Sequence, residues 1–547
     1  MSLPAFSTQA ELFSTAGLSS SLFSQTDRYR LFAQVIYPVL AGARGALEKC
    51  YCADNGRVAI EPVLLLGVSL LQELDGMPDR QALEMLRYHA GWNFALNRQV
   101  GDALFHPTTL VNFRQRLLDH DQSALGFQSI LDALVRAGLV SRQSRQRLDS
   151  TQMFGRVSRM SRLDCARESL RLTLQELEAG LPPDTRPAFW LELWDRYVES
   201  QTDYRAGSET LARKLVEAGT DTWRLLQWTR AKENFAPGPQ LILLERVFGE
   251  QFEVTKNQAA PKDKKELESD RVQNPHDPAA TYAVKGEGTK KKEHVGYKVQ
   301  VAETVTQAEL APGEPTQNFL TGIVTHAAQE SDEAGSQQME AEQAAMGLEK
   351  PPVQYVDGAY VSAEKLARFQ AEGRVLMGLA ASAPRNNGGR FTTEDFDVRV
   401  EERRAICPAG KENTQCSRLE EAVGGKVSCR FEWSTHCGDC ALREQCVGKD
   451  QKHRTMVVGE HHGALQARRR EQKTEAFATG MKHRNGIEGT QSELVRGHGM
   501  RRARFRGLAK ARLQNYFVGA ACNVKRWLRR QVWDLTQAGA GRAVAVS

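Results

Sequence analysis

Three carboxylates, Asp149, Asp357 and Glu488, occur in settings from which they could act together on a phosphate. Asp149 is expected to end a short strand over residues 147–153 (RLDSTQM), and Asp357 to end a buried strand over 353–356. Carboxylates at the ends of neighbouring strands can converge, and a helix carrying Glu488 can bring a third across them. Such oxygen ligands suit Mg²⁺ or Mn²⁺. Two such ions about 4 Å apart could activate a water or a 3′-hydroxyl in phosphoryl transfer.

The chain is most basic around Glu488. Residues 452–530 contain 19 Lys and Arg against 5 Asp and Glu, a local net charge of 19 minus 5, or +14, whereas the whole chain carries +6. A basic surface attracts a phosphate backbone, and the candidate contacts are Arg501, Arg502, Arg506 and Lys510, with Arg504 in the same run. A solvated charged face is the alternative for this run. For Glu488, the alternative is a simple ion pair with Arg484, one helical turn earlier.

Four cysteines could form a tetrahedral thiolate site for zinc. Cys407 is followed by a proline, and Cys437, Cys440 and Cys446 lie in the run HCGDCALREQC. The segment that contains them is polar, and such a segment often needs a metal in order to fold. Reduced, partly buried thiols are the alternative interpretation. The competing ligands, and the thiols expected to stand alone, are Cys416, Cys429 and His436, and Cys50, Cys52, Cys165 and Cys522.

The composition is that of a soluble globular protein, with 41% hydrophobic and 26% charged residues among 547. This length predicts three or four domains. The sequence has no apolar stretch long enough for a transmembrane helix, and MSLPAFSTQAELFS lacks the features of a signal peptide. We therefore expect a cytoplasmic protein whose ten cysteines are reduced.

The N-terminal part, residues 1–140, is predicted to be a helical DNA-binding domain. Residues 60–74 are apolar nearly all round, as in a buried helix. Residues 79–88 continue in helical period, and residues 106–118 (HPTTLVNFRQRLL) begin with a proline and two threonines, a helix N-terminal signal. Arg114 lies outside the apolar face of that last helix and is a candidate DNA contact. A packed bundle with ordinary surface arginines is the alternative.

The rest of the chain is expected to alternate strands and helices. Strand signals occur at 294–302, 319–327, 353–356 and 374–379, and helical segments at 331–347 and 363–371. With the strand over 147–153, this is the order of an α/β core of the ribonuclease H-like kind, although many α/β folds share parts of it. The predicted divisions are 141–157, first part of the core; 158–254, a helical insertion; 255–383, a polar linker to about 293 and then the core; 384–463, a cysteine-rich insertion; and 464–547, C-terminal core helices with Glu488 and the basic segment.

Several of these runs together resemble the bacterial insertion-sequence transposases of the acidic-triad (DDE) class, in the branch with a cysteine-containing insertion before the last acid. The resemblance covers most of the chain. It includes FHPTTLVNFRQRL, LDST at 148–151, HVGYKVQVAET at 294–304, YVDGAY at 355–360 and EDFDVRVEERRAICPAG at 394–410. The most specific run is RNGIEGTQSELVRGHGMRRARFRGLAKARLQNYFVGAACNVKR at 484–526.

Carried over position by position, the resemblance implies that Asp149, Asp357 and Glu488 are the catalytic triad and bind two Mg²⁺ or Mn²⁺ ions. Arg484 matches an arginine of the family's final-acid motif and is a candidate DNA contact. Related families often have a tyrosine three residues before that arginine and a lysine seven after the glutamate, where this chain has Met481 and Val495. The departure concerns DNA contacts, for which Arg496 and Lys298 are further candidates.

The resemblance implies a transposase that binds the terminal inverted repeats of its element, cuts double-stranded DNA at the ends and joins them to target DNA. Cutting two ends together requires two active sites, so a homodimer on paired ends is expected. Two alternatives keep the fold: a nuclease without strand transfer, and a catalytically inactive DNA-binding regulator. The intact triad, with each acid in its family context, argues against the regulator.

Overall fold

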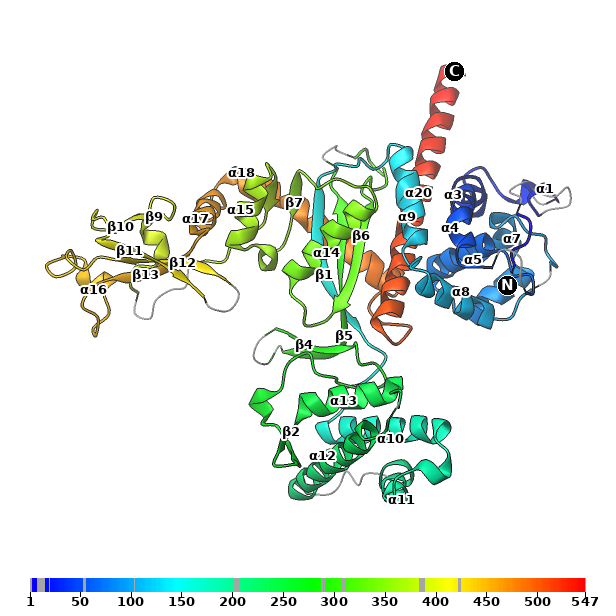
Figure 1. The fold of residues 1–547 in the computed structure, drawn as a ribbon. Helices are drawn as coiled ribbons and strands as arrows, with labels where there is room; N and C mark the ends of the chain where they lie inside the picture. The colour runs from blue at the N-terminus through cyan, green and yellow to red at the C-terminus, as the bar shows by residue number, and fades with distance from the viewer. Residues whose placement is uncertain are drawn as a thin grey trace.

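A mixed β-sheet forms the centre of the molecule, and three lobes surround it (Figure 1). The architecture comes from a computed structural model that describes residues 2–6, 15–18, 20–52, 56–102, 104–200, 207–233, 235–286, 289, 291–306, 310–382, 389–421 and 425–546. The expected α/β class is therefore confirmed.

The sheet combines antiparallel and parallel strands. Side by side lie β6 (Leu320–Ala327), β5 (Lys292–Thr304), β1 (Gln146–Phe154), β7 (Val353–Tyr355) and β8 (Val375–Met377). The pairs β6–β5 and β5–β1 are antiparallel, whereas β1–β7 and β7–β8 are parallel. A sixth strand, β4 (Thr281–Lys285), pairs with the start of β5. Each strand expected from alternating or buried apolar residues is thus present, with small shifts of its ends.

Helices cover both faces of the sheet. Strand β6 contacts both helical layers, because its successive side chains point in opposite directions. Gly322 lies against Met339 of α14 (Asp332–Ala345), where a Cβ atom would meet the methionine sulfur. Thr325 points to the other face, where its hydroxyl accepts a hydrogen bond from Asn515 of α20 (Leu508–Val546). The long helix α20 therefore backs the sheet along β6.

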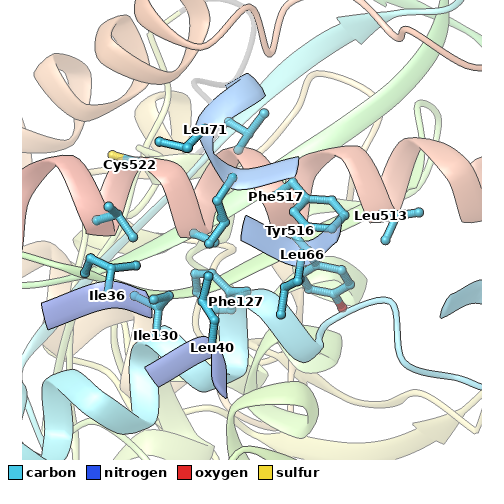
Figure 2. Close-up of a cluster of buried hydrophobic side chains, with 14 of the residues drawn as sticks. Ile36, Leu40, Leu66, Leu71, Phe127, Ile130, Leu513, Tyr516, Phe517 and Cys522 are labelled. Carbon is cyan, nitrogen blue, oxygen red and sulfur yellow. The ribbon is translucent and has the colours of Figure 1, made fainter. Parts of the chain in front are cut away.

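The N-terminal lobe packs on the opposite side of α20. Its helices are α1 (Thr15–Leu18), α2 (Arg28–Leu31), α3 (Tyr37–Gly42), α4 (Arg44–Glu48), α5 (Pro62–Asp75), α6 (Asp79–Tyr88), α7 (Ala90–Ala95), α8 (Thr108–Asp119) and α9 (Leu125–Arg136). Figure 2 shows Leu40, Leu66 and Phe127 from this lobe gathered against Phe517 of α20. The helices expected over 60–74, 79–88 and 106–118 are confirmed as α5, α6 and α8. The lobe and the core thus share one hydrophobic interior.

A helical lobe is inserted between β1 and β4. It contains α10 (Arg162–Gly180), α11 (Trp190–Trp194), α12 (Ser208–Arg230) and α13 (Pro239–Gln251), which enclose a separate apolar cluster. The expectation of a polar linker over 255–293 is wrong. The hairpin β2 (Phe252–Thr255) and β3 (Gln258–Pro261) packs on this lobe through Ala259, and β4 joins the central sheet. Backbone pairing stabilises these short strands, which have too few apolar side chains for a periodic signal.

The cysteine-rich lobe lies at the far end of the sheet from the N-terminal lobe (Figure 1). Its strands are β9 (Asp397–Arg399), β10 (Arg404–Ile406), β11 (Gln415–Glu420), β12 (Val427–Glu432) and β13 (Thr455–Gly459), and its helix is α16 (Arg443–Cys446). This segment was expected to be polar, with little apolar content of its own. Instead, Phe396, Phe431 and Trp433 form a buried core there. Phe396 directly precedes β9, Phe431 lies in β12 and Trp433 directly follows it, so no single run appears apolar.

The last segment returns from the cysteine-rich lobe to the sheet. It runs through α17 (His462–Glu471), α18 (Glu475–Met481) and α19 (Gly486–Ser492) before α20 begins. Helix α15 (Ala363–Ala371), which links β7 to β8, packs beside α17. Among the described residues, no helix has the length and apolar content needed to span a membrane.

Candidate active site

Pairing between β1 and β7 brings Asp149 level with Asp357. The two strands are parallel, with Arg147 beside Tyr355, so the residues two positions farther along are also neighbours. Asp357 follows β7 directly and caps the short turn Gly358–Tyr360, and its carboxylate accepts a hydrogen bond of 2.6 Å from the backbone N–H of Gly358. Asp149 does not end its strand as expected, because β1 continues to Phe154 along β5.

Glu488 reaches the same place from the C-terminal segment. It lies in α19, which contacts β1. Its side chain is 68% exposed and that of Asp357 is 61% exposed, whereas that of Asp149 is only 15% exposed. The three acids therefore form the floor and the open rim of one site.

The guanidinium of Arg484 joins the three carboxylates. Its nitrogens lie 2.9 Å from Glu488, 3.2 Å from Asp149 and 3.9 Å from Asp357. The ion pair between Arg484 and Glu488 expected as an alternative is thus present, but it is one part of a larger cluster. Acids from three distant parts of the sequence thus surround a single positive charge.

Burial raises the pKa of the Asp149 carboxyl group above its usual value. The backbone N–H of Ser150 and the charge of Arg484 lower that pKa, and the neighbouring Asp357 raises it. Burial and the second carboxylate both disfavour the charged form. Positive charge in the site, which Arg484 supplies in this structure, favours the ionised form of Asp149.

The triad fits hard divalent cations by its donor type and by its position around a cationic group. Its oxygens are spread around the guanidinium and do not all lie within 4.8 Å of one another. Within the described ranges, only Glu493, His498 and Cys522 form a set of three potential ligand atoms lying within 4.8 Å of one another. In that group, the Glu493 carboxylate already has two cationic partners, Lys525 at 3.1 Å and Arg526 at 3.0 Å.

The candidate DNA-contact residues fall into two sets. Arg496, Arg502, Arg506 and Lys510 are exposed. The others have partners within the protein. Arg114 pairs with both oxygens of Asp79, and Arg501 donates to the Thr151 hydroxyl and the Gln152 carbonyl. Lys298 donates to the Glu330 carbonyl and lies 3.3 Å from Asp332. Arg504 pairs with Glu73 at 2.7 Å. Only the exposed set is available to DNA without breaking these bonds.

Cys407, Cys437, Cys440 and Cys446 line one small cavity of about 20 Å³, which His436 also borders. Burial raises the pKa of the Cys446 thiol to about 11; Arg454 lowers it and the other three cysteines raise it. Cys416 and Cys429 interact with each other on β11 and β12 instead. The preferred four cysteines are therefore grouped, and the two competing cysteines form a separate pair.

The cavity fits a zinc ion in its ligand type and size. Bonds of about 2.3 Å to a tetrahedral ion would place the sulfurs about 3.8 Å apart. No three of these sulfurs lie within 4.8 Å of one another. Binding of a zinc ion would therefore bring these sulfurs closer together.

A buried ion network behind the triad was not predicted from the sequence. Glu303 on β5 lies between Arg147 of β1 and Arg526 of α20, and all three side chains are at most 10% exposed. The sequence did contain one signal for this network, the charged residue Glu303 within the largely apolar run HVGYKVQVAET. Buried charges of this kind require partners, but the sequence does not show which partners they have.

Two family models match the chain. Residues 406–528 match a transposase DDE domain, and residues 19–116 match a transposase domain of the DUF772 family. No curated protein and no solved structure matches the chain. The two matches support an insertion-sequence transposase of the DDE class, which confirms the resemblance seen in the sequence. They support a transposase function, which implies a DNA substrate, and proteins of this class typically use divalent metals.

We expect the cysteine cavity to bind one zinc ion per chain. Changing Cys437 and Cys440 together to serine should release that zinc, because serine hydroxyls are poor zinc ligands at neutral pH. Elemental analysis of the purified protein would measure the loss. Replacement of Cys416 and Cys429 by serine is the matched control and should leave the zinc content unchanged. Wild-type protein without zinc would contradict the prediction.

Proposed function

We propose that this protein cuts DNA at the terminal inverted repeats of an insertion sequence and joins those ends to target DNA. The observation that carries the proposal is the convergence of Asp149, Asp357 and Glu488 within 4 Å of the Arg484 guanidinium. The order β6–β5–β1–β7–β8, antiparallel and then parallel, supports a ribonuclease H-like core. The two family matches support the same class of enzyme.

The triad would hold two Mg²⁺ or Mn²⁺ ions through its carboxylate oxygens. Bound there, the ions supply activation of the attacking oxygen and stabilisation of the leaving oxygen. Asp149 provides the buried ligand, while Asp357 and Glu488 provide ligands at the open rim. Arg484 pairs with the carboxylates in this structure. When bound ions neutralise those acids, its guanidinium can bind a DNA phosphate instead.

The exposed cations Arg496, Arg502, Arg506 and Lys510 would bind the DNA backbone beside this site. They follow Glu488 in the chain, and Arg502 pairs with Phe154 at the end of β1, the strand that carries Asp149. Contacts with phosphates position DNA and carry no sequence information. Two copies of the chain, acting as a homodimer, would hold two ends of the element and cut them together.

Replacing any triad acid by its amide should abolish cleavage while leaving DNA binding nearly intact. Asp149→Asn, Asp357→Asn and Glu488→Gln each keep the side-chain shape but remove the charge that binds Mg²⁺. Loss of a residue that only supports a metal ligand lowers activity by up to about 100-fold. Loss of a ligand itself should lower cleavage by at least that much. Nicking and gel-shift assays on the same preparations would measure both properties.

Glu475→Gln is the matched control, because Glu475 is an exposed carboxylate in the same basic region, on α18. It should cleave like the wild type. Cleavage near the wild-type rate in one of the triad variants would remove that residue from the proposed site.

Replacing Arg502, Arg506 and Lys510 by alanine should weaken binding to all duplex sequences alike. The slope of log affinity against log salt should become shallower by about 0.9 for each phosphate that the variant no longer neutralises. Titrations on terminal-repeat and random duplexes at three salt concentrations would measure this. Arg501 is kept, because it bonds to Thr151 and Gln152.

The control removes three cations from the inserted helical lobe, Arg213, Lys264 and Lys265, and therefore makes the same change in net charge. Its slope should match that of the wild type. An unchanged slope in the first variant would mean that its cations form only a solvated face. A loss of affinity confined to terminal repeats would mean that they read bases.

A further inference from the structure

The carboxylate of Glu303 is almost fully buried and is shared by three groups from distant segments. Its Oε2 accepts a hydrogen bond of 2.5 Å from Nε of Arg147 on β1. Its Oε1 accepts hydrogen bonds from the Thr490 hydroxyl, at 2.7 Å, and from the Arg526 guanidinium, at 2.5 Å. One acid on β5 thus joins β1, α19 and α20.

Arg526 completes the network from the side of α20. Besides Glu303, it donates to the Thr490 hydroxyl at 2.9 Å, to Glu493 at 3.0 Å and to the carbonyl of Asn318 at 3.0 Å. Its side chain is 3% exposed. These donations satisfy the guanidinium on several sides at once, so the helix end that carries Thr490 and Glu493 is held to the sheet in one position.

The network contacts α19 on both sides of Glu488. Thr490 lies two residues after Glu488, and Gly486 lies two residues before it. Arg147 passes so close to Gly486 that a Cβ atom there would collide with its guanidinium. The same guanidinium donates to the carbonyl of His483, the residue before Arg484, at 3.2 Å. Arg147 is itself two residues from Asp149.

Helix α19 continues directly into helical turns on either side, Lys482–Asn485 and Glu493–Gly497, so the place of Glu488 depends on how this run packs against the sheet. Glu488 is largely exposed, so its position comes from the neighbours that are buried. Buried ion pairs are often no more stabilising than apolar residues of the same volume, although they can fix one arrangement of the elements they join. The network's position, between the strand of Asp149 and the helix of Glu488, fits that second role.

We propose that Glu303 and its partners Arg147, Arg526 and Thr490 are positioning residues that set the place of Glu488 relative to Asp149. The inference rests on the proposed function, because it concerns the divalent-cation site that the triad would form. The hydroxyl of Thr490 and the missing side chain of Gly486 are the two features that connect the network to α19.

The test is Mn²⁺ binding by the full-length protein without DNA, measured by titration calorimetry. Thr490→Val keeps the side-chain shape and removes the hydroxyl, whereas Thr490→Ser keeps the hydroxyl. Gly486→Ala places a methyl group against Arg147, whereas Gly489→Ala, in the same helix, has nothing within 4 Å of the added atom. Glu488→Gln defines how much of the binding depends on the triad. Thermal unfolding shows that each variant is folded at the temperature used.

Thr490→Val and Gly486→Ala should weaken the triad-dependent binding by about 10-fold, as loss of a residue supporting a ligand does. Thr490→Ser and Gly489→Ala should bind like the wild type. The inference is overturned if either Thr490→Val or Gly486→Ala binds Mn²⁺ like the wild type, or if Thr490→Ser is as weak as Thr490→Val. If Glu488→Gln also binds like the wild type, the metal-binding triad itself is refuted, and the inference with it. If only Glu488→Gln is weakened, the positioning role alone fails.

Discussion

Mutual repulsion among three carboxylates is the constraint on which the candidate site depends. Like charges repel, by about 4 kcal/mol for a pair 4 Å apart at the effective dielectric constant of a protein surface and by less at longer range. Positive charge among Asp149, Asp357 and Glu488 reduces that repulsion. Arg484 supplies it here. Divalent ions would supply more charge, and the arginine would then be free to bind phosphate.

The sheet and the C-terminal helices bring these acids together from positions more than 300 residues apart in the sequence. Parallel pairing of β1 with β7 sets Asp149 beside Asp357, and the buried contacts of α19 set Glu488 above them. Both inserted lobes leave this arrangement intact because each enters and leaves between elements of the core. The long helix α20 joins the sheet to the N-terminal lobe, so the end of one matched region shares a hydrophobic core with the other.

Much of the fold could be predicted where one physical signal dominates. The apolar run at 60–74 could only be buried, and α5 is; alternating residues at 294–302 predicted β5. The hairpin β2–β3 could not be predicted, because it is stabilised by backbone pairing rather than by apolar side chains. The triad acids were identified by their local sequence. Their common contact with Arg484, and the partners of Arg114, Arg501 and Lys298, depend on tertiary structure that the sequence does not display.

The joining of a precut DNA end to a plasmid tests the central claim most directly. The purified protein would be incubated with supercoiled plasmid, Mg²⁺ and a duplex that carries the inverted repeat flanking its coding region and ends in a free 3′-hydroxyl. We expect plasmid products covalently joined to that duplex, absent when Mg²⁺ is removed and absent for Glu488→Gln. Nicking of the plasmid without joined products would indicate a nuclease, and joining by Glu488→Gln at the wild-type rate would contradict the proposed active site.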